Sequence, residues 1–191
     1  MTDSTDMQSK IAAKCAEHLD RRTEWDEPPE VLGLFAEDDQ GLRLERLPLP
    51  LEVWEMGPAG VMLGAYAQFV VESEMEALPD LVAVAFRCEA FALQSDASPQ
   101  AEEAIRRRMA GGSAPRNADI PGRIEQRMLS AVDTDGRHYM STASRLADGS
   151  AAPAATKVFT DGQDPTGRIP AALDRLIAAL RLQPAPSRTS D

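Results

Sequence analysis

The chain has 191 residues, of which 43% are hydrophobic and 27% are charged, and its formal net charge is −11. This length suits one large domain, and the composition is typical of a globular protein with an apolar core. The acidic balance disfavours binding to nucleic acid and to anionic membranes, because both need positive charge on the protein.

No apolar run approaches the roughly 20 residues that a membrane helix needs. The N-terminal residues are polar and show no apolar signal region. We therefore expect a cytoplasmic protein that contacts no membrane. Arginine outnumbers lysine and alanine is abundant, which indicates a GC-rich bacterial gene.

The N-terminal part of the chain predicts a short disordered end followed by a helix. Residues 1–5 are polar and are expected to be disordered. Apolar side chains then recur with helical spacing over residues 6–22, on one face formed by Ile11, Ala12, Cys15, Ala16 and Leu19.

A strand hairpin is expected next. Val31–Ala36 and Leu42–Leu47 both have strand-like patterns, and Asp38–Gly41 between them is a tight-turn sequence. Prolines then interrupt the pattern. Residues 51–54 are expected to form a further short strand.

The segment from Pro58 to Met75 predicts a helix that is apolar on most of its sides, which is typical of a buried helix. Gly60 and Gly64 lie one turn apart within it. In a chain without membrane spans, this spacing favours close approach of the helix to a sheet or to another helix.

Leu81–Leu93 is the strongest strand prediction. Its first half is apolar on both faces, and its second half carries Arg87 and Glu89 on one face. This is typical of a central strand whose far end reaches solvent. A short polar helix over Ala101–Ala110 and a mobile loop over Gly112–Gly122 are expected to follow.

A second hairpin is expected from two strand patterns at Ile124–Val132 and Arg137–Ser144, with Asp133–Gly136 as the turn. The chain then predicts a short strand, an amphipathic helix that begins near Pro170, and a disordered tail, at residues 156–160, 169–182 and 183–191.

This order predicts one α+β domain over residues 6–182. Its mixed or mainly antiparallel central sheet has about five to six strands and is flanked by N-terminal, central and C-terminal helices. In element order the chain resembles profilin-like and roadblock-like modules, which place helices around a central antiparallel sheet. No residue motif accompanies this likeness of topology, so no family follows from it.

The sequence contains no motif that identifies a particular catalytic or metal-binding class. There are two histidines, and no metal-ligand spacing, P-loop, dinucleotide-binding glycine motif or hydrolase nucleophile elbow. Asp133–Gly136 looks like the start of a calcium-binding loop, but its glycine comes too early and Ser144 stands where a glutamate ligand is needed. We assign no catalytic residue, metal or cofactor, and an enzyme is not the favoured class.

Two cysteines, Cys15 and Cys88, lie in apolar patterns, and both are expected to be reduced and buried. Cys88 would act as a nucleophile only if a nearby base or positive charge activated it.

The candidate binding residues are Arg87, Glu89, Arg127 and His138. Arg123, Glu125 and Arg127 alternate outward on their strand, as Arg87 and Glu89 do on theirs. If the strands are adjacent, opposite charges can pair across them for about 0.2–1 kcal/mol each. His138 could add acid–base chemistry, although Tyr139 beside it points to the opposite face.

Charge is also distributed unevenly along the chain. Residues 24–39 hold seven acids and no base, whereas residues 104–127 hold six arginines and two acids. Arginine suits carboxylates and phosphates, so the second region is either an anion or acidic-partner site or a solvated surface. It could also contact the acidic segment, in the same chain or in a second copy.

Three functions remain open. The first is a non-catalytic interaction or regulatory protein, with a homodimer as one version, and its motivation is apolar surface beyond what a small monomer can bury. The second is a binding protein for a small anion or metabolite, or an unmarked enzyme, with its cleft near Arg87 and Arg127. The third is an acidic decoy that mimics nucleic acid.

Overall fold

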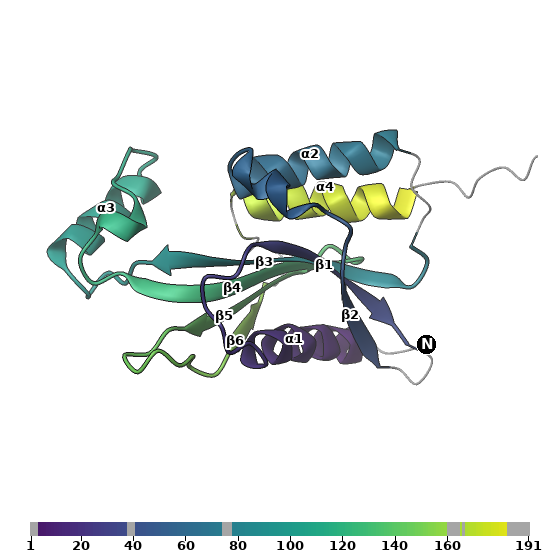
Figure 1. The fold of residues 1–191 in the computed structure, drawn as a ribbon, viewed down its shortest axis with the longest axis horizontal. Helices are drawn as coiled ribbons and strands as arrows, with labels where there is room; N and C mark the ends of the chain where they lie inside the picture. The colour runs from purple at the N-terminus through teal and green to yellow at the C-terminus, as the bar shows by residue number, and fades with distance from the viewer. Residues whose placement is uncertain (1–3, 38–40, 74–77, 160–164, 166, 183–191) are drawn as a thin grey trace, which may run out of the picture.

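A computed structural model describes residues 4–37, 41–73, 78–159, 165 and 167–182. In these residues one antiparallel sheet of six strands has the order β2-β1-β3-β4-β5-β6 (Figure 1). The elements, in chain order, are α1 (Ser4–Asp20), β1 (Glu30–Ala36), β2 (Leu42–Arg46), the 3-10 helix η1 (Leu51–Glu55), α2 (Ala59–Glu72), β3 (Leu81–Ala92), α3 (Pro99–Met109), the 3-10 helix η2 (Asn117–Asp119), β4 (Ile124–Asp133), β5 (His138–Ser144), β6 (Ala155–Val158) and α4 (Arg168–Leu182).

Helices cover both faces of the sheet (Figure 1). Side chains alternate along β3, so Ala83 and Ala85 pack toward α1 while Val84 and Phe86 pack toward α2 and α4. The sheet therefore separates two apolar cores, which is why the first half of β3 is apolar on both sides.

The two helices on one face run side by side and begin at the same end of the sheet. A Cβ atom added at Gly60 of α2 would lie 2.6 Å from the Cβ of Arg168 at the start of α4. One added at Gly64 would lie 3.2 Å from the Nη2 atom of Arg175. The two glycines thus permit the close helix approach that their spacing predicts.

The predicted α+β class, the central position of the strand at 81–93 and both antiparallel hairpins are confirmed. The first helix begins at Ser4, slightly before the expected boundary. Residues 183–191, for which we predicted disorder, and residues 38–40 of the predicted turn lie outside the described residues. Within those residues, no helix is both long and apolar enough to cross a lipid bilayer.

Two local predictions were wrong. Residues 51–55 form the 3-10 helix η1 rather than a strand, because Pro50 lacks the amide that sheet pairing needs and suits the residue before a helix. The helix at residues 59–72 is buried on one side only, and Phe69 remains 56% exposed. Its apolar outer side faces away from the core.

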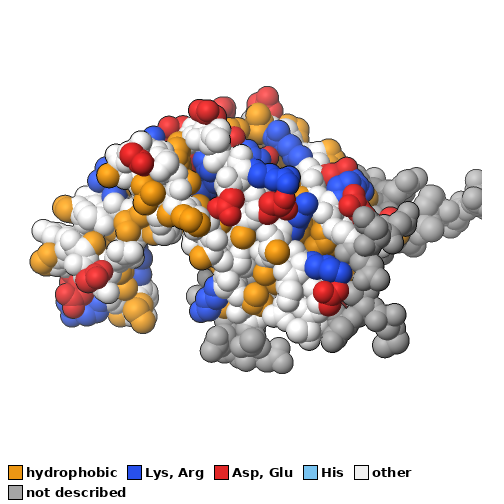
Figure 2. All heavy atoms as spheres, turned by 90° about the horizontal axis from the view of Figure 1, so that it is seen from below, with side chains coloured by type: hydrophobic (Ala, Val, Ile, Leu, Met, Phe, Trp, Pro, Cys, Tyr) orange, Lys and Arg blue, Asp and Glu red, His pale blue; other side chains and the backbone are white. Residues whose placement is uncertain are grey.

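The connection between β3 and β4 forms an arm that ends in α3. Ser98 caps α3 by accepting a hydrogen bond from the Ala101 amide, and a small core of Ala101, Ala104 and Ile120 holds this end together. Figure 2 shows the arm standing away from the body of the molecule, with a hollow between them. The predicted loop at 112–122 contains the short helix η2.

Candidate functional site

Three of the four predicted binding residues come together on the sheet face that α1 covers. Glu89 on β3 lies directly opposite Arg127 on β4, and Glu30 on β1 lies opposite Arg87 on β3. The Arg127 Nε atom lies 3.3 Å from Glu89 Oε1, and the Arg87 Nε atom lies 2.9 Å from Glu30 Oε1. The predicted pairing of opposite charges across neighbouring strands is therefore confirmed.

The expectation that these arginines point outward to solvent was wrong. Arg87 is 1% exposed and Arg127 is 0% exposed. The chain leaves α1 at Asp20 and crosses this part of the sheet before it enters β1, so the connector at residues 21–29 covers both guanidinium groups. Pairing and hydrogen bonding offset the cost of burying these charges.

Backbone carbonyls complete the surroundings of Arg127. Its Nη1 atom donates to the carbonyl of Arg22 at 2.8 Å, and its Nη2 atom donates to that of Glu24. The ring of Trp25 lies with its centroid 4.6 Å from the Arg127 guanidinium carbon, in the range of a cation–π contact. Arg127 thus anchors the connector to the sheet.

Arg87 has a similar role on the neighbouring strand. Its Nη2 atom donates to the Pro28 carbonyl at 2.6 Å, and its Nη1 atom donates to Glu27 Oε2 at 3.3 Å. Arg22 donates to Glu27 and to Glu30. Glu27 of the connector and Glu30 at the start of β1 are therefore paired with arginines of the same chain.

Glu30 lies at the centre of these charges. Burial raises its pKa, but the hydrogen bond from His18 and the charges of Arg87 and Arg22 outweigh that effect, and the pKa falls from an ordinary 4.5 to about 2. The His18 Nε2 atom lies 3.4 Å from Glu30 Oε1. His18 was not among the candidate residues, so sequence reasoning missed this contact.

All three nitrogens of each buried guanidinium have partners within the chain. Neither Arg87 nor Arg127 lines the two cavities described below. An anion would have to displace these internal partners to bind either group, so the geometry favours a structural role for both arginines.

His138 lies apart from the other three residues, on the opposite face of the sheet. Its Nε2 atom lies 3.1 Å from Asp174 Oδ1 on α4. Tyr139 points to the α1 side and donates a 2.6 Å hydrogen bond to Asp133 Oδ2. Burial and this hydrogen bond raise the pKa of Tyr139 above its usual value of 10. The predicted divergence of His138 and Tyr139 is confirmed.

The arginine-rich region does not form one surface. Arg106 and Arg107 on α3 both pair with Glu103 on the same helix. Arg123 lies over the ring of Phe91, with its guanidinium carbon 5.0 Å from the ring centroid. Within the described residues, Arg127 is the member that contacts the acidic segment 24–39, through its hydrogen bond to Glu24.

One cluster of acids has metal-like spacing. Asp26, Glu89 and Glu125 each offer an oxygen within 4.8 Å of the others. Both oxygens of Glu89 already have partners, because Oε1 accepts from Arg127 and Oε2 accepts from the Asp26 amide at 2.7 Å. Internal hydrogen bonding accounts for this cluster, and we assign no metal to it.

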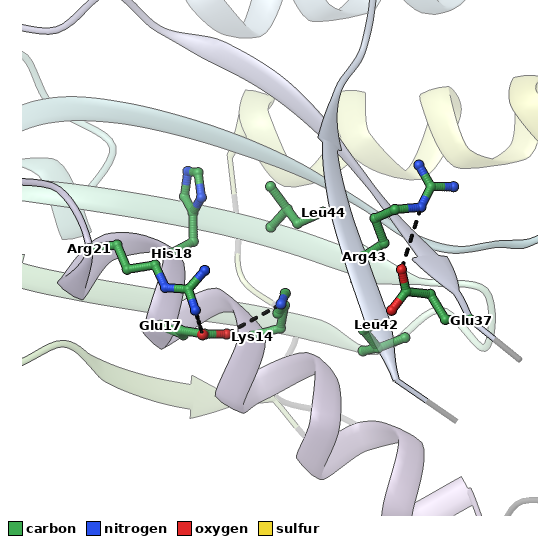
Figure 3. A pocket seen from close by; sticks show the side chains of 8 residues that line it. All are labelled: Lys14, Glu17, His18, Arg21, Glu37, Leu42, Arg43 and Leu44. Atoms are coloured by element: carbon green, nitrogen blue, oxygen red, sulfur yellow. Dashed lines mark ion pairs between the residues drawn. The ribbon is translucent and has the colours of Figure 1, made fainter. Parts of the chain in front are cut away.

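A groove of about 280 Å³ lies between α1 and the edge strand β2 (Figure 3). Side chains from both elements line it, and its charges are paired among themselves. Glu17 contacts both Lys14 and Arg21, and the Arg43 Nε atom lies 3.8 Å from Glu37. The lining holds three cations and two acids, and each of them is in an ion pair, so none of these charges is left over to select a ligand.

A second cavity of about 440 Å³ lies between the sheet and the first turns of α2 and α4. Cys88 is among its lining residues. Burial raises the pKa of the Cys88 thiol to about 11, and burial raises that of Cys15 to about 12. Neither thiol has the lowered pKa of an activated nucleophile, so we assign Cys88 no catalytic role.

No family model, curated protein or solved structure matches this chain. The function has to be inferred from the geometry of these surfaces and cavities.

Proposed function

We propose that this protein is a non-catalytic interaction module that self-associates through the outer face of η1 and α2. One observation carries the proposal. Seven large hydrophobic side chains are exposed in the described part of the chain, and five of them lie within residues 51–71, namely Leu51, Met56, Val61, Phe69 and Val71. Exposed apolar side chains that gather in this way mark interaction surfaces.

The geometry of α2 places its exposed apolar residues together. At about 100° per residue, the buried Leu63, Tyr66, Ala67 and Val70 fall on one side of the helix, and the exposed residues fall on the other. Val61 and Ala65 lie near the middle of the exposed side, and Phe69 and Val71 lie at its two margins. Gln68 and Glu72 also lie on this side, which is otherwise apolar. A mostly apolar helix side that the core does not cover is suited to a partner.

The charges around this face favour a second copy of the chain as the partner. The segment from Leu51 to Glu72 contains acids and no base, whereas the later turns of α4 beside it carry two arginines, Arg175 and Arg181, and one acid. A two-fold axis parallel to these helices would set α2 of one copy against α4 of the other. Acidic and basic surfaces would then meet across the interface.

Analytical ultracentrifugation over a concentration series tests the proposal. We expect a monomer–dimer equilibrium, and we expect Phe69→Ser to weaken it by about tenfold or more, since large buried side chains dominate interface energies. Met109→Ser is the matched control, because Met109 is 85% exposed on α3, far along the chain from this face.

Two results would contradict self-association. One is a wild-type chain that stays monomeric at the highest attainable concentration. The other is an equal effect of Phe69→Ser and Met109→Ser on the dimer, which would place the interface elsewhere.

A further inference from the structure

The cavity at the first turns of α2 and α4 has features that the proposed self-association does not use. Its volume of about 440 Å³ falls within the usual range of small-molecule pockets. The sheet forms one side of it, through Phe86, Cys88, Met128, Ser130 and Met140. The beginnings of the two helices form the other side (Figure 1).

The sheet side of the cavity is suited to an apolar group. Met128, Met140 and Phe86 are among its lining residues, and methionine adapts its shape to varied ligands. The Ser130 hydroxyl, the one hydroxyl group among the lining residues, is placed 3.5 Å from the sulfur of Met140.

The helix side of the cavity carries positive charge. Among the thirteen described residues that line the cavity, Arg168 is the one with a charge, although the whole chain has 31 acids. No ion pair of Arg168 occurs among the described residues. An anionic group beside Arg168 would be attracted by this positive charge, and none of the thirteen lining residues is an acid that would repel it.

The N-terminal ends of α2 and α4 also favour an anionic group. Neither α2 nor α4 has an acidic residue in its first turn. Pro58 before α2 makes no side-chain capping bond, and Gly167 before α4 has no side chain with which to cap. Among the described residues, the amides of Ala59 and Gly60 in α2 and of Arg168 and Ile169 in α4 have no acceptor, whereas Val61 donates to the Pro58 carbonyl and Pro170 has no amide. These four amides lie at the end where the helix dipole favours negative charge.

We propose that this cavity binds a small carboxylic acid with an apolar body. The apolar body packs against Met128, Met140 and Phe86, and the carboxylate lies beside Arg168 and the first amides of the helices. Binding here needs neither the dimer nor the buried pair of Arg127 and Glu89.

Cys88 allows binding to be measured directly, because its thiol lines the cavity. The rate of its alkylation by iodoacetamide is followed by peptide mass spectrometry, with octanoate, octanol or octylamine present. Cys15 is 0% exposed in the other core and serves as the internal reference for global unfolding. We expect octanoate to protect Cys88 most strongly, octanol less, and octylamine least, with no effect on Cys15.

Calorimetric titration of variants separates the two parts of the cavity. Arg168→Gln should weaken octanoate binding by about tenfold, the usual effect of losing a hydrogen bond to a charged group, and leave octanol binding unchanged. Arg106→Gln, at an exposed arginine of α3, is the matched control. Met128→Trp fills the cavity and should abolish binding of both. If that variant fails to fold, the Arg168 comparison still decides the question.

The proposal would be overturned if none of the three probes slowed Cys88 alkylation. It would also be overturned if octylamine bound as tightly as octanoate, or if Arg168→Gln and Arg106→Gln affected octanoate binding equally.

Discussion

Glu89 and Arg127 face each other across β3 and β4, with Nε 3.3 Å from Oε1, and Arg127 is completely buried. The same guanidinium holds the carbonyls of Arg22 and Glu24 in the connector that follows α1. One side chain therefore joins the sheet to the segment that covers it.

Replacing Arg127 by methionine should strongly destabilise the fold. The change leaves Glu89 Oε1 and two carbonyls without the donor that Arg127 supplies, and losing one partner of a buried ion pair costs about 3–5 kcal/mol. Urea unfolding measures the loss. Arg106→Met, at an exposed helix position, should change the free energy of unfolding by less than about 0.5 kcal/mol. A small effect at Arg127 would mean that the buried pair contributes little.

Two buried tyrosines should respond differently to the loss of their hydroxyl groups. Tyr139 donates to Asp133 at 2.6 Å, so Tyr139→Phe should cost about 1.5–3 kcal/mol, as for a hydrogen bond to a charged group. The buried Tyr66 hydroxyl has no hydrogen-bond partner in the described structure. Tyr66→Phe should be neutral or stabilising. Thermal and urea unfolding of both variants test the contrast, and similar losses would contradict it.

Acid should weaken the fold partly through Glu30. Its pKa is lowered to about 2 when folded from an ordinary 4.5, so its contribution is fully present above pH 4.5 and is lost as the pH falls toward 2. The shift corresponds to about 3 kcal/mol. Urea midpoints between pH 5 and pH 2 should fall more steeply for the wild type than for Glu30→Gln. Parallel pH profiles would show that Glu30 is not the group responsible.

Changing the two glycines of α2 to alanine should have opposite effects on the free energy of unfolding. At Gly60 the new methyl group would lie 2.6 Å from the Cβ of Arg168, and the crowding should cost about 1–3 kcal/mol despite a better helix propensity. At Gly64 the nearest atom is the mobile end of Arg175, 3.2 Å away. Gly64→Ala should therefore be neutral or stabilise by up to about 1 kcal/mol. Urea unfolding decides, and equal effects would argue against the close contact at Gly60.

Local patterns in the sequence predicted most of the fold. The alternation of Val84 and Phe86 with Ala83 and Ala85 identified a central strand, because side-chain direction in a strand has a period of two. Turn residues such as Asp133 and Gly136 identified a hairpin, since Gly136 adopts a φ of 83° that most residues avoid.

Two kinds of feature could not be predicted in this way. Residues 51–55 are rich in apolar side chains, yet such a short segment has no period long enough to separate a strand from a 3-10 helix. The apolar pattern of α2 was also ambiguous, because hydrophobicity does not tell whether a partner element covers a given side. The exposure of Phe69 follows from where α4 packs.

The sequence by itself determined which face of its strand each of Glu89 and Arg127 occupies, because the strand period is a local property, whereas only the packing of β3 against β4 made them a pair. Only the tertiary structure decided that this pair is buried rather than solvated. Burial depends on the path of residues 21–29 across the sheet, and that path is held by contacts between segments about a hundred residues apart, such as Arg127 with Arg22. The same distant packing brought the first turns of α2 and α4 together around the cavity that Arg168 lines.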